Sequence, residues 1–500
     1  MPPLTPFISP LITANAINNQ MPDPAASATT PIVPWVGSRP NPLDILPFIL
    51  FYLALLFACA PPPFRGRGIL FFALIATLQW RCIVSPWPPN ESDTRPLRYG
   101  IGNSWIFALP AVERLLVNTP ERDFWHVDGD DPVQWQIRQK PTPKEFTWKK
   151  VWWAMTIWAT PRGVGWNFGW KRLNAQRARI RAARLDANRK TNDCVEGTPT
   201  GGRAEFVAVH LARIFVAYLC WDAVTLAEQK AIVPTAWAWD PLTIGRIMLL
   251  EVMMVIVVYA GMVMQFGIGA VAGVGLFLSD PEDWPPLFGS LFDCYKISNV
   301  WGRFWHQYLR QPCLGFSHYL VQKLHIPPRS LLAYFTHLMT AFAIADLVHV
   351  LSIGSVIPGY MSLRDLISDM SIFFLLQPLA TIAEAIVIML WNKYMQPKLI
   401  PTFNPETQVP MKPAAATEGD SAQSSQASSS TQVENMPLRD WKQKSMPVLV
   451  TAMCRLVGYI WVLCWFTFTG WWFIKAYADV GMADWKMPFS ILEKLLIPGK

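Results

Sequence analysis

Long apolar runs constrain this chain more than any other feature of its sequence. A helix of about 20 apolar residues crosses the hydrocarbon core of a bilayer, and eight runs of about this length, some slightly shorter, recur along the 500 residues. They are Ile45–Ala60, Gly68–Ser85, Ile101–Val117, Phe206–Val224, Ile244–Leu278, Ser330–Ile357, Leu366–Leu390 and Met446–Ile474. Because a backbone in lipid must satisfy its own hydrogen bonds, the runs predict an all-α polytopic membrane protein with about eight transmembrane helices.

Composition and charge support a bilayer partner. Hydrophobic residues make up 52% of the chain and charged residues only 16%, and the mean hydropathy is +0.23. Many of the 25 tryptophans fall near the ends of apolar runs, where their amphipathic rings suit the membrane interface. The net charge is +8, and the basic residues that cause it gather in loops beside the apolar runs. This distribution fits the positive-inside rule and not nucleic-acid binding.

Composition also divides the chain into four parts. Residues 1–41 are rich in Pro, Ala, Asn and Thr and are expected to form a disordered tail. Residues 42–402 form the membrane-embedded core. Residues 403–445 contain the low-complexity sequence SAQSSQASSSTQ and read as a cytosolic linker. Residues 446–500 hold the last transmembrane helix and a tail.

Some segments of the core leave more than one interpretation open. Ile101–Val117 is interrupted by Pro110, which makes it the least regular of the eight runs. Ile244–Leu278 is longer than one crossing needs, so it is either one tilted helix or a helix plus a re-entrant piece. Its glycines would allow close helix packing.

Two segments outside the runs suggest interfacial helices. Phe146–Thr160 carries four tryptophans and two lysines and resembles a helix lying in the interface. The stretch from Arg162 to Arg203 is strongly basic, which places it in the cytosol. It predicts either a helix that binds anionic headgroups or a solvated cytosolic helix.

Cysteine usage and one sequon add two further expectations. The eight cysteines are scattered without metal-ligand spacing, so neither a disulfide framework nor a metal site is predicted. Asn90-Glu-Ser is a glycosylation acceptor if its loop faces the lumen.

Two histidines are the candidates for chemistry. His306 lies in the segment Trp284–Arg310, among aromatic residues and arginines between two apolar runs, and His349 lies inside the next run. An ionisable group at membrane depth is costly and therefore a functional candidate, and a neutral imidazole can accept a proton from an alcohol near physiological pH. The alternative for His349 is a structural hydrogen bond to a neighbouring helix. His337 lies twelve residues before His349 on a similar helix face and has the same status.

Several motifs follow one another along the chain in the same order as the motifs of a known protein family. Trp284-Pro-Pro-Leu-Phe-Gly289, Arg303-Phe-Trp-His306-Gln307 and the intramembrane His349 resemble the wax-synthase-like branch of the membrane-bound O-acyltransferases. Arg162-Gly-Val-Gly-Trp-Asn167 resembles an RG-x-GW-N segment of that branch, and Gln377-Pro378 with Glu384 resembles its Q-P…E segment. The length and the Ser-rich insertion are similar to fungal O-acetyltransferases of secondary-metabolite pathways, including meroterpenoid pathways. Asp346 departs from the small residues that usually precede the family's second histidine.

The resemblance implies acyl transfer from a CoA thioester to a hydroxyl group inside an intramembrane tunnel. His349 would be the general base, and His306 would donate a hydrogen bond to the thioester oxygen or orient the acyl group. The residues expected to bind the substrate or CoA are Arg303, Trp305, Gln307, Trp301, Asn167 and Glu384. No bound cofactor is implied, since acetyl-CoA or another acyl-CoA is a co-substrate. The expected setting is the endoplasmic reticulum membrane, with a hydrophobic alcohol as acceptor and other enzymes of a biosynthetic pathway as an open partner class.

Three other functions stay open at this point. A long-chain acyl-CoA:alcohol acyltransferase would use the same residues on wax or sterol esters. A transporter also uses intramembrane His, Asp and Glu residues, although the two halves of this chain show no matching hydropathy. A membrane scaffold would not need two histidines in this aromatic setting.

Overall fold

The protein is described by a computed structural model that covers residues 42–85, 95–127, 142–143, 145–186, 194–195, 197–199, 201–227, 232–234, 237, 239–357, 361–394, 448–484 and 489–496. The tail 1–41, the linker 403–445 and Asn90 lie outside these residues. The helices of the first half are α1 (Leu46–Cys59), α2 (Arg67–Val84), α3 (Arg95–Gly102), α4 (Trp105–Ala111), α5 (Pro120–Asp123), α6 (Trp148–Ala159), α7 (Lys171–Leu185) and α8 (Arg203–Leu226). Those of the second half are α10 (Pro241–Gly275), α11 (Ile297–Asn299), α12 (Arg310–Lys323), α13 (Leu331–Gly354), α14 (Leu363–Tyr394), α16 (Val448–Asp479) and α17 (Ile491–Leu496). A two-stranded antiparallel sheet pairs β1 (Cys194–Val195) with β2 (Thr198–Pro199).

Six of the described helices are long and apolar enough to cross a membrane: α2, α8, α10, α13, α14 and α16. The apolar helix α1 is shorter. The expectation of an all-α polytopic membrane protein is therefore confirmed, with fewer long helices than the eight apolar runs suggested.

The third expected span, Ile101–Val117, is wrong as a single helix. The chain there forms the end of α3, the short helix α4 and a π-helical turn, η2 (Val112–Val117). Pro110 lies inside α4 and cannot donate a backbone hydrogen bond. Arg114 in η2 is buried and donates to the carbonyl oxygen of Ile157, 2.7 Å away. A broken backbone that carries a buried cation packs inside the protein and does not form a spanning helix.

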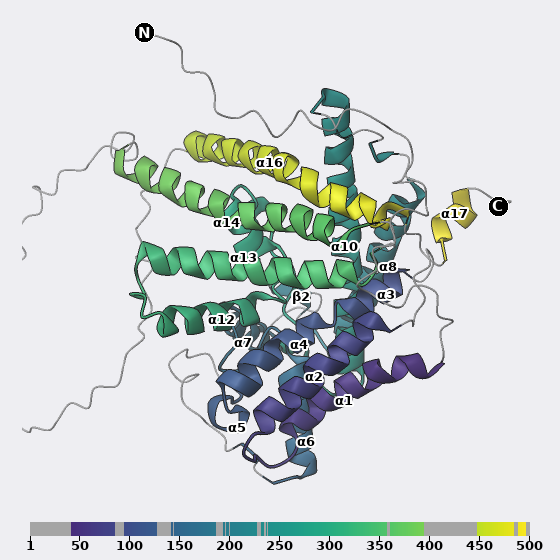
Figure 1. Ribbon diagram of the computed structural model, residues 1–500, viewed down its shortest axis with the longest axis vertical. Helices are drawn as coiled ribbons and strands as arrows, with labels where there is room; N and C mark the ends of the chain where they lie inside the picture. The colour runs from purple at the N-terminus through teal and green to yellow at the C-terminus, as the bar shows by residue number, and fades with distance from the viewer. Residues whose placement is uncertain are drawn as a thin grey trace, which may run out of the picture.

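Four helices lie side by side in the order α12, α13, α14 and α16 (Figure 1). They pack in sequence order, although α16 follows α14 only after the linker. Helix α10 contacts α16 and crosses behind this row to pair with α8. The C-terminal helix is thus an integral part of the core.

The run Ile244–Leu278 forms one helix, α10, of 35 residues, so the re-entrant alternative is wrong. Its glycines let α8 approach closely, as expected. A Cβ atom on Gly261 would lie 2.8 Å from the ring of Trp221, and one on Gly267 would lie 2.7 Å from the Ile214 side chain. Small residues at such contacts are typical of helix packing in membranes.

A second group of helices, α1, α2, α4 and α6, packs around an apolar cluster below the row (Figure 1). A buried ion cluster connects the beginnings of α2 and α6. The carboxylate of Glu121 accepts hydrogen bonds from Arg67, at 2.7 and 2.6 Å, and from Lys150 Nζ, at 2.7 Å. Helix α6, expected to lie in the interface, buries Lys150 and packs on α1.

Helix α7 confirms the helix expected in the basic stretch and shows what it contacts. Arg177 lies 2.7 Å from Asp283, and Arg184 forms an ion pair with Glu282. Both acids belong to the 3-10 turn η4 (Pro281–Asp283), which leads directly into Trp284. The basic helix therefore holds the start of the segment that carries His306.

Candidate active site

The segment Trp284–Arg310, called the histidine loop below, folds back on itself before it reaches His306. The backbone N–H of Gly289 donates to the carbonyl oxygen of Phe304, 2.9 Å away. A side chain at Gly289 would place its Cβ 2.3 Å from the carbonyl oxygen of Arg303, so only glycine allows this approach. The chain then forms a π-helical turn, η6 (Val300–Phe304), and becomes extended at Trp305. This turn presents His306 to the interior.

Gln307 and Arg310 lock the exit from that turn. Arg310 donates to the carbonyl oxygen of Gly302 at 2.8 Å and to the Gln307 side-chain oxygen at 2.9 Å. The Gln307 amide donates in turn to the backbone carbonyls of Trp301 and Trp305. The Arg310 guanidinium lies 3.7 Å from the ring centre of Trp170, which adds a cation–π contact. Gln307 therefore contacts the backbone of the loop.

Helix α14 holds the loop from one side through Glu384. Its Oε1 accepts a hydrogen bond from the backbone N–H of Ile297 at 2.6 Å, and its Oε2 accepts one from Ser298 at 3.0 Å. The indole N–H of Trp461 in α16 also donates to Oε1, at 2.9 Å. A carboxylate that accepts three such bonds fixes α11 against α14 and α16.

Gln377, two turns earlier in α14, fixes the aromatic part of the loop. Its side-chain oxygen accepts from the indole N–H groups of Trp301, at 3.3 Å, and Trp465, at 3.1 Å. Its amide nitrogen donates to Phe373 O and to the Thr469 hydroxyl. The Gln377 side chain is fully buried with all of these partners in place. Trp301 consequently sits in an aromatic box with edge-on contacts to Phe342 and Phe373.

The RG-x-GW-N segment holds the loop from the opposite side. Arg162 is buried and donates to the carbonyl oxygens of Pro285, at 2.6 Å, and Pro286, at 3.0 Å. Asn167 donates to the Asp123 carbonyl and accepts from the Trp125 N–H. These contacts place Asn167 on the neighbouring loop and give it a structural function there.

His349 is held by its own helix. Its Nδ1 lies 2.7 Å from the carbonyl oxygen of Ala345, one turn earlier in α13. Since a carbonyl only accepts, Nδ1 carries the proton and Nε2 keeps its lone pair. The ring lies against Phe374 of α14, with centroids 4.7 Å apart. This hydrogen bond stays within α13, whereas the structural alternative expected one to a neighbouring helix, and it leaves the other ring nitrogen available.

His306 lies close to His349, although 43 residues separate them in the sequence. Burial lowers the pKa of His306 to about 3, and the neighbouring His349 contributes to that lowering. The Nδ1 atom of His306 is buried and has no hydrogen-bond partner among the described residues. The rings of Phe288 and Trp305 surround it. The structure therefore places a buried imidazole, whose Nδ1 has no partner among the described residues, beside His349.

The remaining histidines lie apart from this pair. His337 Nδ1 is 2.8 Å from the Ser317 hydroxyl, and its ring is 4.8 Å from that of His318. His210 bonds to the Phe206 carbonyl and stacks on its ring, in line with a structural function. His337 and His210 contact residues of one or two neighbouring helices. Among the described residues, neither contacts His306 or His349.

The structure thus separates the expected site residues into groups. His306 and His349 meet, with Trp301 and Trp305 close by, while Gln307 and Glu384 grip the loop backbone. Arg303 is exposed, and its expected contact with CoA phosphate stays a prediction. Reasoning from the sequence missed Arg310 and the bracing function of Arg162 and Gln377. The motifs already contained Arg162 and Gln377, but their partners are backbone atoms, which no side-chain pattern reveals.

Six helices long and apolar enough to cross a bilayer, with two histidines close together, define a polytopic membrane protein with a candidate site for chemistry. Residues 284–376 match the model of the membrane bound O-acyl transferase family, a segment that contains both histidines. The chain is 25% identical over 311 residues to acetyltransferase ple2 of Rhodocybe pseudopiperita, covering 60% of this chain and 71% of that protein. It is 24% identical over 315 residues to acetyltransferase sirH of Emericella nidulans, covering 60% and 65%, and 23% identical over 321 residues to O-Mevalon transferase yanI of Aspergillus niger, covering 59% and 66%.

These matches span about two thirds of the length of the three relatives. No solved structure matches the chain. The matches confirm the resemblance recognised from the sequence, and they support an acyltransferase enzyme that is similar to the membrane-bound O-acyltransferases.

Proposed function

We propose that this enzyme transfers an acetyl group from acetyl-CoA to a hydroxyl group of a terpenoid or meroterpenoid in the endoplasmic reticulum membrane. The observation that carries the proposal is the pair of adjacent imidazoles: His349, whose Nδ1 bonds within α13, and His306, whose buried Nδ1 has no partner among the described residues. The names of two relatives, both acetyltransferases, support the acetyl donor.

The two imidazole rings, of His349 and His306, would each perform one part of the reaction. The Nε2 atom of His349 accepts the proton of the acceptor hydroxyl as its oxygen attacks the thioester carbonyl. The C–O bond forms, negative charge develops on the carbonyl oxygen, and an N–H of His306 donates a hydrogen bond to that oxygen. The C–S bond then breaks, and the His349 imidazolium returns its proton to the leaving CoA thiolate. The products are an ester and free CoA, with no covalent enzyme intermediate.

A neutral His306 suits this function. With a pKa of about 3, the ring stays uncharged at physiological pH, so it neither repels the developing imidazolium nor needs a counter-ion.

The test is a mass-spectrometric assay of microsomes supplied with acetyl-CoA, palmitoyl-CoA and a panel of terpenoid alcohols. An acetylated terpenoid together with released CoA is the expected result. A palmitoyl ester would keep the reaction class and move the function to wax or sterol esters. No ester from any donor would contradict the proposal and favour a transporter.

A further inference from the structure

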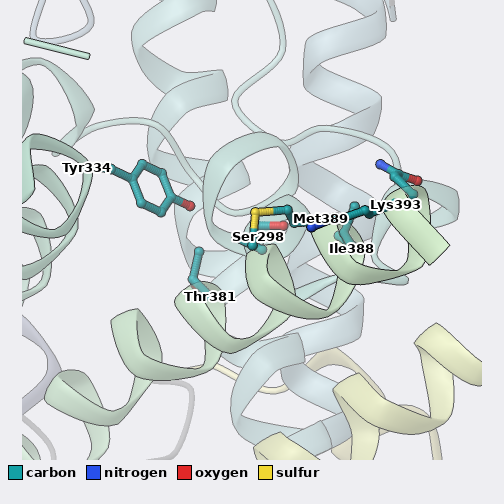
Figure 2. A pocket seen from close by; sticks show the side chains of 8 residues that line it. Ser298, Tyr334, Thr381, Ile388, Met389 and Lys393 are labelled. Carbon is teal, nitrogen blue, oxygen red and sulfur yellow. The ribbon is translucent and has the colours of Figure 1, made fainter. Parts of the chain in front are cut away.

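A pocket between α13 and α14 does not explain how an acyl donor is held. Its volume is about 640 Å³, and it is lined by one face of α14, by Tyr334 of α13 and by Ser298 of the histidine loop (Figure 2). Neither His306 nor His349 lines it, and Lys393 is the only cation among its lining residues. A donor with several phosphate charges needs more positive charge, placed closer to the histidines.

Two arginines lie over the same indole ring, where the basic helix α7 meets the end of the histidine loop. The guanidinium of Arg310, the first residue of α12, lies 3.7 Å from the ring centre of Trp170. The guanidinium of Arg172, in the first turn of α7, lies 5.7 Å from the same ring centre. The side chain of Arg172 is exposed, whereas that of Arg310 is partly buried. One cation therefore faces solvent, and the other lies deeper beside the same ring.

The two cations lie close together, and neither forms an ion pair with a carboxylate among the described residues. Burial and the neighbouring charge of Arg172 lower the pKa of Arg310 to about 10, so the two guanidinium groups are near enough to repel each other. Neither α7 nor α12 has an acidic residue in its first turn, where the helix dipole disfavours a cation. An anion bound by both arginines would offset these unfavourable interactions.

Both arginines have donors left for such an anion. Arg310 uses its Nη1 for the Gly302 carbonyl and the Gln307 side chain, and none of its hydrogen bonds to the described residues uses Nη2. Arg172 donates no hydrogen bond to them. Asn174 fixes the start of α7 by two hydrogen bonds of 2.9 Å to the backbone of the RG-x-GW-N segment. The two guanidinium groups are therefore positioned before a ligand arrives, and their planar donors suit the oxygen atoms of a phosphate.

We propose that Arg172 and Arg310, placed around the ring of Trp170, bind a phosphate group. Two molecules can supply it, the acyl-CoA donor or a phospholipid of the surrounding membrane. The position favours the donor, and this part of the inference rests on the proposed function. Arg310 lies four residues after His306, at most about 14 Å of chain, which the extended pantetheine arm of CoA can bridge. A phosphate held at Trp170 would anchor the donor with its thioester within reach of His306.

The first experiment measures equilibrium binding by calorimetry with the full-length enzyme in detergent. The probes are CoA and dihexanoyl phosphatidic acid. Arg172→Gln should weaken the binding of CoA about tenfold, the loss expected for one charge-assisted hydrogen bond. Arg172 is the residue to change because Arg310 also holds Gln307. Arg179→Gln removes the same charge from another exposed position of α7 and should leave binding unchanged.

The second experiment separates the phosphates from the rest of the donor by steady-state kinetics. Arg172→Gln should raise KM for acetyl-CoA about tenfold and leave kcat unchanged, because the phosphate contact is the same in the ground state and the transition state. The KM for acetyl-pantetheine, a donor without the phosphates, should not change. A rise of equal size with both donors would contradict recognition of a donor phosphate.

Calorimetry also separates this inference from the proposed reaction, because binding needs no turnover. Weaker CoA binding in Arg172→Gln, with normal binding in Arg179→Gln, would support the site even if no donor gave an ester, a result that would overturn the proposed function alone. A loss confined to phosphatidic acid would support the same site with a lipid phosphate as its ligand. Three results would overturn the site: a wild type that binds neither probe, unchanged binding of both probes in Arg172→Gln, or equal losses in the two variants, which would indicate a diffuse basic surface.

Discussion

The Nδ1 atom of His349 lies 2.7 Å from the carbonyl oxygen of Ala345. This one bond sets the tautomer of the ring and so decides which nitrogen is available as a base. Because both residues belong to α13, this hydrogen bond does not depend on any other element. The loop that carries His306 has hydrogen bonds of its own, but its position also depends on Glu384, Gln377 and Arg162, which come from distant parts of the chain.

The proposed function of His306 can be tested with substitutions that remove or keep its N–H hydrogen-bond donor. His306→Leu should lower kcat about 10²- to 10³-fold, the loss expected when one oxyanion donor is removed. His306→Gln keeps an N–H donor and should lose about tenfold less. Since His306 is neutral above pH 3, neither change should move the acidic limb of the pH–rate profile. Equal activity of the two variants, or a shifted limb, would contradict a hydrogen-bonding function.

Glu384 should act on catalysis through the loop it holds. Glu384→Gln keeps the shape but replaces one acceptor oxygen by an NH₂ group, so the N–H of Ile297 or Ser298 loses its partner. We expect a destabilisation of about 1–3 kcal/mol and a fall in kcat with little change in KM for acyl-CoA. Thermal unfolding and steady-state kinetics measure both. Glu145→Gln, at an exposed position, is the control, and a raised KM with unchanged kcat would instead indicate direct substrate binding.

The buried carboxyl group of Glu113 should make the free energy of unfolding depend on pH. Burial raises its pKa from 4.5 to about 7, opposed by the Arg114 charge and the Gln311 hydrogen bond. The folded protein therefore binds a proton that the unfolded chain releases, and stability falls as the pH rises from about 4.5 to 7, by up to about 3 kcal/mol. Glu113→Gln should flatten this slope in thermal unfolding. A wild-type slope in that variant would show that other groups cause it.

The buried cluster around Glu121 should be sensitive to loss of its anion. Glu121→Ala leaves Arg67 and Lys150 buried without a counter-charge, and we expect about 3–5 kcal/mol of destabilisation. The triple variant Glu121→Leu, Arg67→Met and Lys150→Met removes all three charges and should be more stable than Glu121→Ala. The reverse order would mean that the cations are solvated.

How far the sequence predicted this fold depends on the kind of signal. Apolar length correctly placed α10 and α13, because a spanning helix needs little beyond its own residues. It failed at Ile101–Val117, where composition resembles a span but Pro110 breaks the helix and Arg114 is buried. A short apolar run looks the same whether it faces lipid or protein.

The site was predictable to a similar degree. The cost of an ionisable group at membrane depth singled out both His306 and His349, and the structure brings the two together. The hydrogen bonds of Glu384 and Arg162 to backbone atoms were not predictable, since a binding carboxylate and a bracing carboxylate have the same sequence signature.

The most direct test of the account compares wild type with His349→Ala and His349→Gln. Each microsomal preparation receives acetyl-CoA and a terpenoid alcohol, and the ester is quantified by mass spectrometry beside the amount of inserted protein. The account predicts an acetylated product in the wild type and a loss of at least about 10²-fold in both variants at equal protein level, since each lacks the proton acceptor. Wild-type-like ester formation by either variant would show that Nε2 of His349 is not the base.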